Sequence, residues 1–383
     1  MTWWRPARPI LMTTDPIGGV WNYALDLCRE LGEHKIAIKL ASMGRRLHPS
    51  ERAQVGQLAH VELFESDFKL EWMALPWGDV AAAGDWLGDL AARCAPRLIH
   101  LNQFSYGALD WKVPCLVVGH SCVYSWFQAV KGRLPGAEWQ KYQRMVSRGL
   151  SGADRVTAPS QWMLSALERN YGRFAAAQSI YNGRDSSRFV PRVKEDLILT
   201  SGRLWDEAKN IAVLGTAAAK LDWPIFAAGE ITGPHGEGCS LENLQLLGRL
   251  GATDLGGWMS RAAIFVLPAY YEPFGLSILE AALAGCALVL GDIASLREIW
   301  QDTALFVPPD DVDRIAAALA LLIADAPLRK ALACKARERA LAFTTERSAR
   351  AYLALYQEML SKPRSKSLPS KAALPNGEGR AQP

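Results

Sequence analysis

The fold is decided by the stretch "AAIFVLPAYYEPFGLSILEAALAGCALVLGD", residues 262–292. Residues 262–268 and 287–292 are short, nearly continuous apolar runs, as expected of strands that are buried on both faces of a sheet. The segment between them begins near Gly275 and stops at Gly285, and we predict a helix there. A strand, a helix and a second strand in this order predict a parallel sheet.

The same alternation runs along most of the chain and is interrupted once. Residues 183–197 are rich in Gly, Ser, Pro and charge, which is typical of a linker. Because 383 residues exceed one ordinary hydrophobic core, we predict two α/β domains, each with a parallel sheet. The expected units are an N-terminal domain at 1–190, a second domain at 191–345, a helix at 346–361 that crosses back to the first domain, and a disordered tail at 362–383.

The positions of the predicted strands also indicate where a ligand would bind. They cover residues 9–14, 35–42, 97–102, 114–120, 155–160 and 179–183 in the first domain, and 197–202, 225–230, 244–250, 262–268, 287–292 and 304–309 in the second. Predicted helices cover residues 19–31, 79–94, 137–150, 160–170, 208–221, 275–285, 310–325, 327–342 and 345–361. Open parallel sheets bind ligands beyond the carboxyl ends of their strands, so we expect the site in a cleft between the domains.

Composition is that of a globular protein. Apolar residues make up 50% of the chain and charged residues 21%, and a net charge of +4 is too small to argue for nucleic acid. The N-terminal apolar run, residues 10–12, is shorter than the ~7–15 residues of a secretory signal, and no stretch reaches the ~18 apolar residues of a spanning helix. The seven cysteines are scattered without a CxxC pair, which favours reduced thiols. We therefore expect a cytoplasmic protein.

Gly18 and Gly19 follow the first predicted strand, in "TTDPIGGVW", and open the first predicted helix. Glycines let the backbone approach a ligand closely, and a helix N-terminus favours an anion. The loop lacks the GxGxxG pattern, so a nicotinamide-binding site is not supported. A tight turn without a ligand explains this loop equally well.

His120 stands where the apolar strand at 114–120 ends, so its imidazole would point to the same edge of the sheet and could contact a sugar hydroxyl or take a proton. A satisfied structural histidine is the more common case. A Cys–His pair with Cys122 is discounted, because residues two apart on one turn rarely reach the required geometry.

Arg203 and Lys209, in "SGRLWDEAKN", lie at the end of the first strand of the second domain and in the helix that follows. Two cations near a helix N-terminus suit two adjacent phosphates. The alternative is a solvated surface pair with Asp206 and Glu207.

Glu272 precedes the helix of the opening stretch and Glu280 lies within it. The free amides of Phe274, Gly275 and Leu276 would point the same way as Glu272. A carboxylate in such apolar company is costly unless it accepts hydrogen bonds, and a hydroxyl-rich ligand supplies the donors.

No carboxylate cluster has convincing metal spacing. The DxD at Asp311 and Asp313 precedes a long amphipathic helix, and we interpret it as an N-cap with a first-turn acid.

Taken together, these motifs resemble the retaining GT-B glycosyltransferases of glycosyltransferase family 4, also called group 1. The signature is "EPFGLSILE", with seven residues between two glutamates. In the same order the chain carries "GGV", "GH", "APS", "YNGRD", "SGRLxxxAKN", "LLGRL" and "LFVPPDDVDRIAAAL". The resemblance covers about residues 8–345 and implies two Rossmann-like domains that face each other across a deep cleft.

The resemblance also implies which residues hold a sugar nucleotide in that cleft. The diphosphate would be bound by Gly18, Gly19, Arg203 and Lys209, the donor sugar by His120, Glu272, Phe274, Gly275 and Leu276, the ribose by Glu280, and the base beside Arg249 and Leu250. Within this set the catalytic residues would be His120, Glu272, Arg203 and Lys209.

The reaction that the resemblance implies needs no metal cofactor, because the two cations would stabilise the leaving diphosphate. Retention is expected from front-face attack assisted by the departing phosphate. The implied function is transfer of a hexose from a UDP- or GDP-sugar to a saccharide or lipid-linked glycan, in exopolysaccharide or cell-surface glycan assembly. Two alternatives stay open: an inactive nucleotide-sugar-binding regulator of the same fold, and a GT-B-like nucleotide-sugar epimerase.

The chain departs from the family pattern at Ser121, where aspartate is common, and at Arg184, where a small apolar residue is common. We expect both on the acceptor side. Residues 124–148 mix tryptophan and phenylalanine with lysine and arginine, which would suit peripheral contact with the inner face of the plasma membrane. An amphipathic helix with a solvated basic face is the other interpretation.

Overall fold

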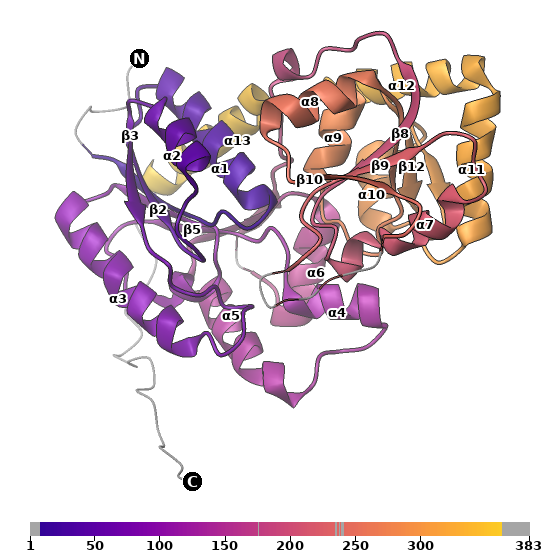
Figure 1. The fold of residues 1–383 in the computed structure, drawn as a ribbon. Coiled ribbons are helices and arrows are strands. Elements are labelled where there is room, and N and C mark those ends of the chain that lie inside the picture. Colours follow the sequence, from indigo (N-terminus) through magenta and orange to yellow (C-terminus); the bar gives the residue numbers. More distant parts are fainter. Residues whose placement is uncertain (1–7, 175, 234–235, 237, 239–240, 362–383) are drawn as a thin grey trace.

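Two parallel sheets, one in each half of the chain, form the framework of the molecule (Figure 1). The computed structural model describes residues 8–174, 176–233, 236, 238 and 241–361. The disordered tail predicted at 362–383 lies outside the described residues. The predicted α/β class with two Rossmann-like domains is confirmed.

The first sheet has seven parallel strands in the order β3-β2-β1-β4-β5-β6-β7. Its strands are β1 (Ile10–Thr14), β2 (Ile38–Ser42), β3 (Val61–Glu65), β4 (Leu98–Leu101), β5 (Cys115–Val118), β6 (Arg155–Ala158) and β7 (Ala177–Ser179). The helices of this domain are α1 (Gly19–Glu33), α2 (Pro49–Gly56), α3 (Trp77–Cys94), α4 (Val123–Lys131), α5 (Gln140–Gly152) and α6 (Gln161–Tyr171). Apolar side chains form a separate core on each face of the sheet.

The second sheet has six parallel strands in the order β10-β9-β8-β11-β12-β13. Its strands are β8 (Glu195–Ser201), β9 (Ile225–Ala228), β10 (Gln245–Gly248), β11 (Ala262–Leu267), β12 (Ala287–Gly291) and β13 (Leu305–Val307). The helices are α7 (Ala212–Ala218), α8 (Ala252–Arg261), α9 (Leu276–Leu283), α10 (Ala294–Trp300), α11 (Val312–Ala324) and α12 (Ala326–Ala340). One large apolar core serves this domain.

Residues 262–292 form β11, α9 and β12 as predicted. Both strands are fully buried, and they pair in parallel with Ile264 opposite Ala287. Glycines with positive φ flank the helix, Gly275 at 89° before it and Gly285 at 82° after it. Only glycine adopts this conformation without strain, which explains why the helix starts and ends there.

The helix predicted at 208–221 is shorter and starts later. Residues Glu207–Lys209 form a 3-10 turn, and α7 begins only at Ala212. The turn is capped by Asp206, whose carboxylate accepts from the amide of Ala208 at 3.0 Å. Asn210 then adopts a left-handed conformation, with φ of 55°, which a continuous α-helix excludes. Lys209 therefore lies in the loop before the helix. The sequence interpretation also did not include α2, α8, α10 and β3, and α4 was covered only by the amphipathic helix considered for residues 124–148.

Sheet topology creates two switch points. In the first sheet β1 lies between β2 and β4, and in the second β8 lies between β9 and β11. On either side of β1, and likewise of β8, the connections to the neighbouring strands run in opposite directions. The loops at these points therefore diverge and leave room for a ligand. The loops after β1, β8 and β11 carry Gly18, Arg203 and Glu272.

The C-terminal helix α13 (Thr345–Ser361) returns to the first domain, where Figure 1 shows it in yellow behind the N-terminal half. Tyr352 and Tyr356 are almost fully buried and belong to the same apolar core as α1. The two ends of the described chain therefore fold together.

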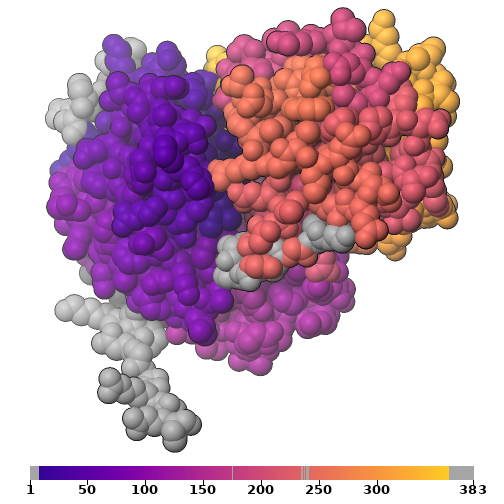
Figure 2. All heavy atoms as spheres, in the orientation of Figure 1, coloured from indigo at the N-terminus to yellow at the C-terminus, as the bar shows by residue number. Residues whose placement is uncertain are grey.

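The two domains are in contact over a broad surface (Figure 2). At one place the N-terminal amides of α6, from Gln161 and Trp162, donate to the Glu298 carboxylate of α10 at 2.8 and 2.7 Å. A helix N-terminus favours a carboxylate in this position. At another place Arg249 of the second domain donates to Glu51 of α2 at 2.9 Å. These contacts fix how the loops at the two switch points face each other.

Candidate active site

Arg203 brings the two switch points together. Gly18 is the N-cap of α1, and a Cβ built there would lie 3.3 Å from Nη1 of Arg203. Gly18 has φ of 104°, so only glycine leaves room for this guanidinium without strain. A Cβ at Gly19 would lie 3.4 Å from Cδ1 of Leu276 at the start of α9. The predicted site residues Gly18, Gly19, Arg203 and Leu276 are therefore neighbours.

The two predicted cations have different partners. Arg203 donates to Asp206 at 2.6 Å, and its side chain remains 37% exposed. Lys209 instead donates to Glu272 at 2.7 Å, and both side chains are mostly buried, at 12% and 14% exposed. Arg203 thus pairs with Asp206, but this carboxylate is buried rather than solvated, and Lys209 pairs with neither Asp206 nor Glu207.

The loop before α9 holds Glu272 beside free amides. The amide of Phe274 lies 3.5 Å from Oε1 of Glu272, and Ser295 of α10 donates to the Glu272 carbonyl at 2.7 Å. Gly275 follows as the N-cap of α9, so the first amides of this helix have no partner within it. The arrangement offers a carboxylate, an ammonium and helix amides to a single ligand.

His120 is oriented by a chain of hydrogen bonds from neighbouring strands. Asn102, directly after β4, donates its amide to the carbonyl of Thr13 at 2.6 Å, so its Oδ1 is left to accept. His120 lies 2.8 Å from that oxygen through Nε2, which must therefore carry the proton. Burial lowers the pKa of His120 to about 3, so the ring is neutral at physiological pH. Nδ1 is the acceptor that remains.

Glu280 has a partner that the sequence interpretation did not foresee. Arg184 donates to Oε1 of Glu280 at 2.6 Å and also pairs with Asp26 of α1. All three side chains are at most 7% exposed. Arg184, expected on the acceptor side, lies between the two domains, because buried carboxylates from both attract its guanidinium. Nothing in the sequence pattern relates positions 26, 184 and 280.

Arg249 bridges the domains at the edge of the second sheet. It follows β10 and donates to Glu51 of α2 at 2.9 Å and to Glu230 at 3.1 Å. Leu250 next to it is half-buried. Both lie on the second-sheet side of the interface, on the opposite side of β8 from the loop of Glu272.

Asp15 is a buried carboxylate that the sequence interpretation missed. It follows β1 directly and accepts from the amide of Ile17 at 3.0 Å and from Gln103 at 3.3 Å. Burial raises its pKa to about 6, and the Arg203 charge opposes this shift. An acid at the carboxyl end of the first strand, in "TTDPIGG", was the signal that could have identified it.

The aromatic and basic residues at 124–148 divide between two environments. Trp126 of α4 donates its ring nitrogen to Asp206 at 3.2 Å, and Lys131 pairs with Glu207, so both contact the second domain. Arg133, Lys141 and other basic side chains of this segment are exposed. Asp311 caps α11 as predicted, accepting from the amide of Arg314 at 2.9 Å.

The fold and site define an α/β protein in which two Rossmann-like domains present cations, carboxylates and helix N-termini to one another. Comparison with known proteins gives the family. The family model "Glycosyltransferase Family 4" matches residues 17–188, and "Glycosyl transferases group 1" matches residues 184–339. A D-inositol 3-phosphate glycosyltransferase of Streptomyces bingchenggensis is 30% identical over 91% of this chain and 86% of its own length. The chain belongs to the group 1 glycosyltransferases of family 4, and the predicted resemblance is confirmed.

A second relative is more similar over a shorter region. Glycogen synthase of Mycobacterium tuberculosis is 40% identical over 68% of this chain, and the alignment spans 64% of the relative. Among solved structures, sucrose-phosphate synthase from Thermosynechococcus elongatus has a TM-score of 0.76 at 20% identity, covering 92% of this chain and 99% of that one. Anabaena HepE in complex with UDP and glucose has a TM-score of 0.73 at 16% identity, covering 92% and 99%. These structures share the GT-B fold.

Among the described residues, no helix combines the length and the apolar character needed to cross a bilayer.

Proposed function

We propose that this chain is a retaining glycosyltransferase that moves a hexose from a UDP- or GDP-sugar to a saccharide or lipid-linked glycan. The observation that carries the proposal is the contact between Arg203 and the glycine loop, because it places a guanidinium of one domain against the N-terminus of α1 in the other. A helix N-terminus and an arginine fork are complementary to a diphosphate.

The sugar half of the donor would lie at the Lys209–Glu272 pair. Glu272 can accept from sugar hydroxyls, while the ammonium of Lys209, 2.7 Å away, would lie between the sugar and the diphosphate. The unpaired amides at the start of α9 would complete this subsite. His120 would accept a hydroxyl hydrogen at Nδ1, since its Nε2 proton is committed to Asn102.

The proposed chemistry relies on the charges of the chain. Arg203 and Lys209 would stabilise the negative charge that develops on the diphosphate as the glycosidic bond breaks, so the proposal assigns no metal cofactor. Retention would follow from attack on the face that the diphosphate leaves, with the departing phosphate accepting the proton of the acceptor hydroxyl. Isolation of a glycosyl ester on Glu272 would contradict this step.

The relatives support the substrate classes without fixing one. HepE was solved with UDP and glucose, which supports a uridine nucleotide. The matched relatives include a glycogen synthase, an O-antigen chain mannosyltransferase and an undecaprenol-diphosphate N-acetylgalactosaminyltransferase. Saccharide and lipid-linked acceptors are both represented, in keeping with a role in glycan assembly.

The test is a thermal-shift panel of UDP-, GDP- and ADP-sugars, followed by transfer assays with the sugar that binds. A ligand at a hundred times its dissociation constant stabilises the folded chain by about 2.7 kcal/mol. Arg203→Ala should reduce the shift, and the anomeric configuration of the product, read by NMR, should match that of the donor. Binding that Arg203→Ala and Lys209→Ala both leave unchanged would refute the diphosphate assignment. Conversion of the donor without an acceptor would indicate an epimerase.

Peripheral contact with the cytoplasmic face of a membrane is a separate part of the proposal. It rests on exposed basic side chains of α4, α5 and the loop between them, namely Lys131, Arg133, Lys141, Arg144 and Arg148. Leu134, 57% exposed, projects from the same loop. Basic residues near an apolar tip favour anionic lipid. Flotation with phosphatidylglycerol vesicles at low salt tests this, and an absence of binding would remove it.

A further inference from the structure

A buried cluster of charges links the two domains next to the proposed nucleotide site. Arg184 stands between Asp26 of α1 and Glu280 of α9, with 2.6 Å from its Nη2 to Oε1 of Glu280. Arg29 and Arg188 approach Asp26 at 2.8 and 3.7 Å. The only carboxylate of α9 therefore reaches α1 through one guanidinium.

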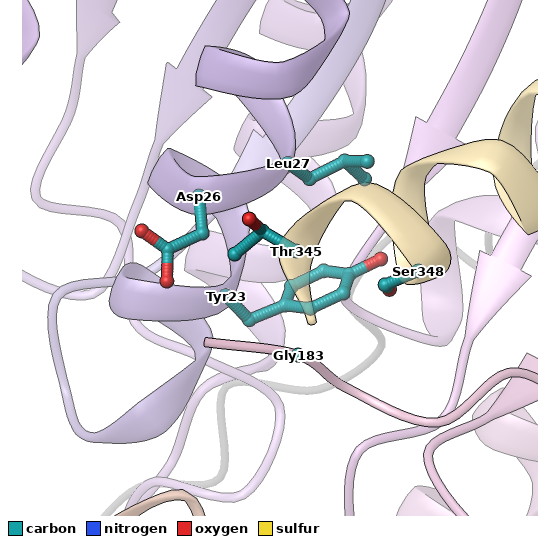
Figure 3. Close-up of a pocket in the computed structure, with 6 residues that line it drawn as sticks. All are labelled: Tyr23, Asp26, Leu27, Gly183, Thr345 and Ser348. Atoms are coloured by element: carbon teal, nitrogen blue, oxygen red, sulfur yellow. The ribbon is translucent and has the colours of Figure 1, made fainter. Parts of the chain in front are cut away.

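The backbone around Arg184 is held tightly. Its amide donates to the carbonyl of Phe343 at 3.0 Å. A Cβ at Gly183 would overlap the carbonyl of Thr344, so no other residue fits before Arg184. Figure 3 shows Gly183 at a small pocket that is also lined by Asp26 of α1 and Thr345 of α13. The position of the guanidinium is thus set by two helices and the linker together.

The cluster leaves hydrogen-bonding capacity unused. Arg184 engages both carboxylates through its Nη atoms, while its buried Nε has no hydrogen-bond partner in the described part of the chain. Glu280 uses Oε1 for Arg184, and its Oε2 accepts no hydrogen bond from any described residue. Buried polar networks that serve stability alone are normally complete. The free oxygen of Glu280 is available to a hydroxyl donor.

The charge of Glu280 depends on Arg184. Burial raises the pKa of Glu280, Arg184 is the strongest influence that lowers it, and the negative charge of Asp26 raises it further. The groups that face this carboxylate are Asp26 from α1, with Arg29 behind it, and Arg184 and Arg188 from the linker. Without Arg184, two buried carboxylates would face each other and the pKa of Glu280 would rise further.

We propose that Arg184 is a positioning residue for nucleotide recognition. It holds Glu280 ionised by pairing with Oε1, on the side of the cluster where Asp26 lies. Oε2 of Glu280 is then left to accept from the ribose hydroxyls of the donor. This inference rests on the proposed function, in which Glu280 binds the ribose. Because the same guanidinium holds Asp26, ribose binding is linked to the contact between α9 and α1. The arginine that departs from the family pattern thereby acquires a role in the donor site.

The experiment compares the affinities of UDP, GDP and ADP with those of their 2′,3′-dideoxy forms by isothermal titration calorimetry. A hydrogen bond to an ionised group predicts that the wild-type chain prefers the hydroxylated form of its nucleotide by about tenfold or more. Arg184→Met should reduce this ratio to about threefold or less at pH 7, and the ratio should rise again as the pH rises. Asp26→Asn, which keeps the Arg184–Glu280 pair, should retain the wild-type ratio.

A second pair keeps the test decisive if Arg184→Met does not fold. Asp26→Asn and the double variant Asp26→Asn/Arg184→Gln both lack the Asp26 charge, and only the double variant should lose the preference for the ribose hydroxyls. Equal preference in the two members of this pair would overturn the role of Arg184 while leaving the proposed function intact. If the wild-type chain shows no such preference, or if Glu280→Gln leaves it unchanged, the ribose assignment fails and the inference fails with it.

Discussion

Two glutamates on either side of the start of α9 form ion pairs of very different kinds. Glu272 pairs with Lys209 inside the second domain, and both side chains reach solvent at 14% and 12% exposure. Glu280 pairs with Arg184 in a largely buried cluster that includes Asp26 of the first domain, and the three side chains are at most 7% exposed. The first pair can exchange its partner for a ligand, whereas the second cannot be opened without separating α9 from α1.

The difference shows that the same residue type serves two purposes within one helix segment. A pair that still reaches solvent costs less to rearrange than one with no access to water, because water can replace part of the lost interaction. A buried pair contributes little net stability, but the loss of one partner leaves an uncompensated charge. Each expected effect below follows from this contrast.

The largest effect is expected from the enclosed pair. Arg184→Met should lower the free energy of unfolding by about 3–5 kcal/mol, because it leaves the buried Glu280 without its partner and Asp26 with only the more exposed Arg29 and Arg188. Urea denaturation measures this change. Lys220→Met, which removes an exposed pair with Asp313, is the matched control and should have little effect. Equal losses in the two variants would show that the enclosure of the cluster does not matter.

The open pair should matter for rate instead. Lys209→Met should lower kcat by about 10²–10³, since it removes a charge that stabilises the leaving group. Its effect on unfolding should be clearly smaller than that of Arg184→Met. Transfer assays at saturating donor, together with urea denaturation, separate the two effects. If Lys209→Met loses stability but keeps its kcat, the Lys209–Glu272 pair serves the fold rather than the reaction.

Asp15 extends the comparison to a buried carboxylate that has no ion pair within the described residues. The folded chain keeps its proton up to about pH 6, while an unfolded aspartate releases it near 3.8. The folded state therefore binds more protons between these values, and stability falls as the pH rises through this window, by about 3 kcal/mol. Asp15→Asn should abolish this decline. Identical slopes in the two chains between pH 4 and 6 would show that Asp15 ionises normally.

The smallest effect concerns the glycine beside Arg203. Gly18→Ala and Gly172→Ala both place a side chain at positive φ, 104° and 95°, and each should cost about 1–2 kcal/mol of stability. Only Gly18 has a neighbour, Arg203, so only Gly18→Ala should also weaken binding of the nucleotide sugar by several-fold. Calorimetric titration of both variants tests this. An equal loss of affinity in the two variants would mean that backbone strain, rather than the contact with Arg203, weakens nucleotide-sugar binding.

Much of the fold could be predicted from short-range patterns. The apolar runs of β11 and β12 are recognisable because parallel strands are buried on both faces, and the glycines at 275 and 285 mark the ends of the helix between them. The motif around Glu272 also indicated the family, which the comparisons confirm. The roles assigned to the site residues stay predictions.

Other elements were missed for definite reasons. The 3-10 turn at Glu207–Lys209, capped by the preceding Asp206, and the left-handed Asn210 interrupt what looked like a continuous helix. Helices α8 and α10 begin without a side-chain N-cap, so their starts do not stand out from the neighbouring loops. Burial of one face in the folded domain, rather than local propensity, makes them helices.

The sequence by itself determined the two parallel sheets, the family and the set of polar residues that end the strands, because these depend on the order and spacing of neighbouring residues. Only the tertiary structure decided how the charges are paired. Lys209 binds Glu272 rather than its sequence neighbours, and Arg184 joins Asp26 to Glu280 across the two domains. Such pairing depends on distance and burial in three dimensions, since a charge removed from water takes whichever opposite charge the fold brings within reach.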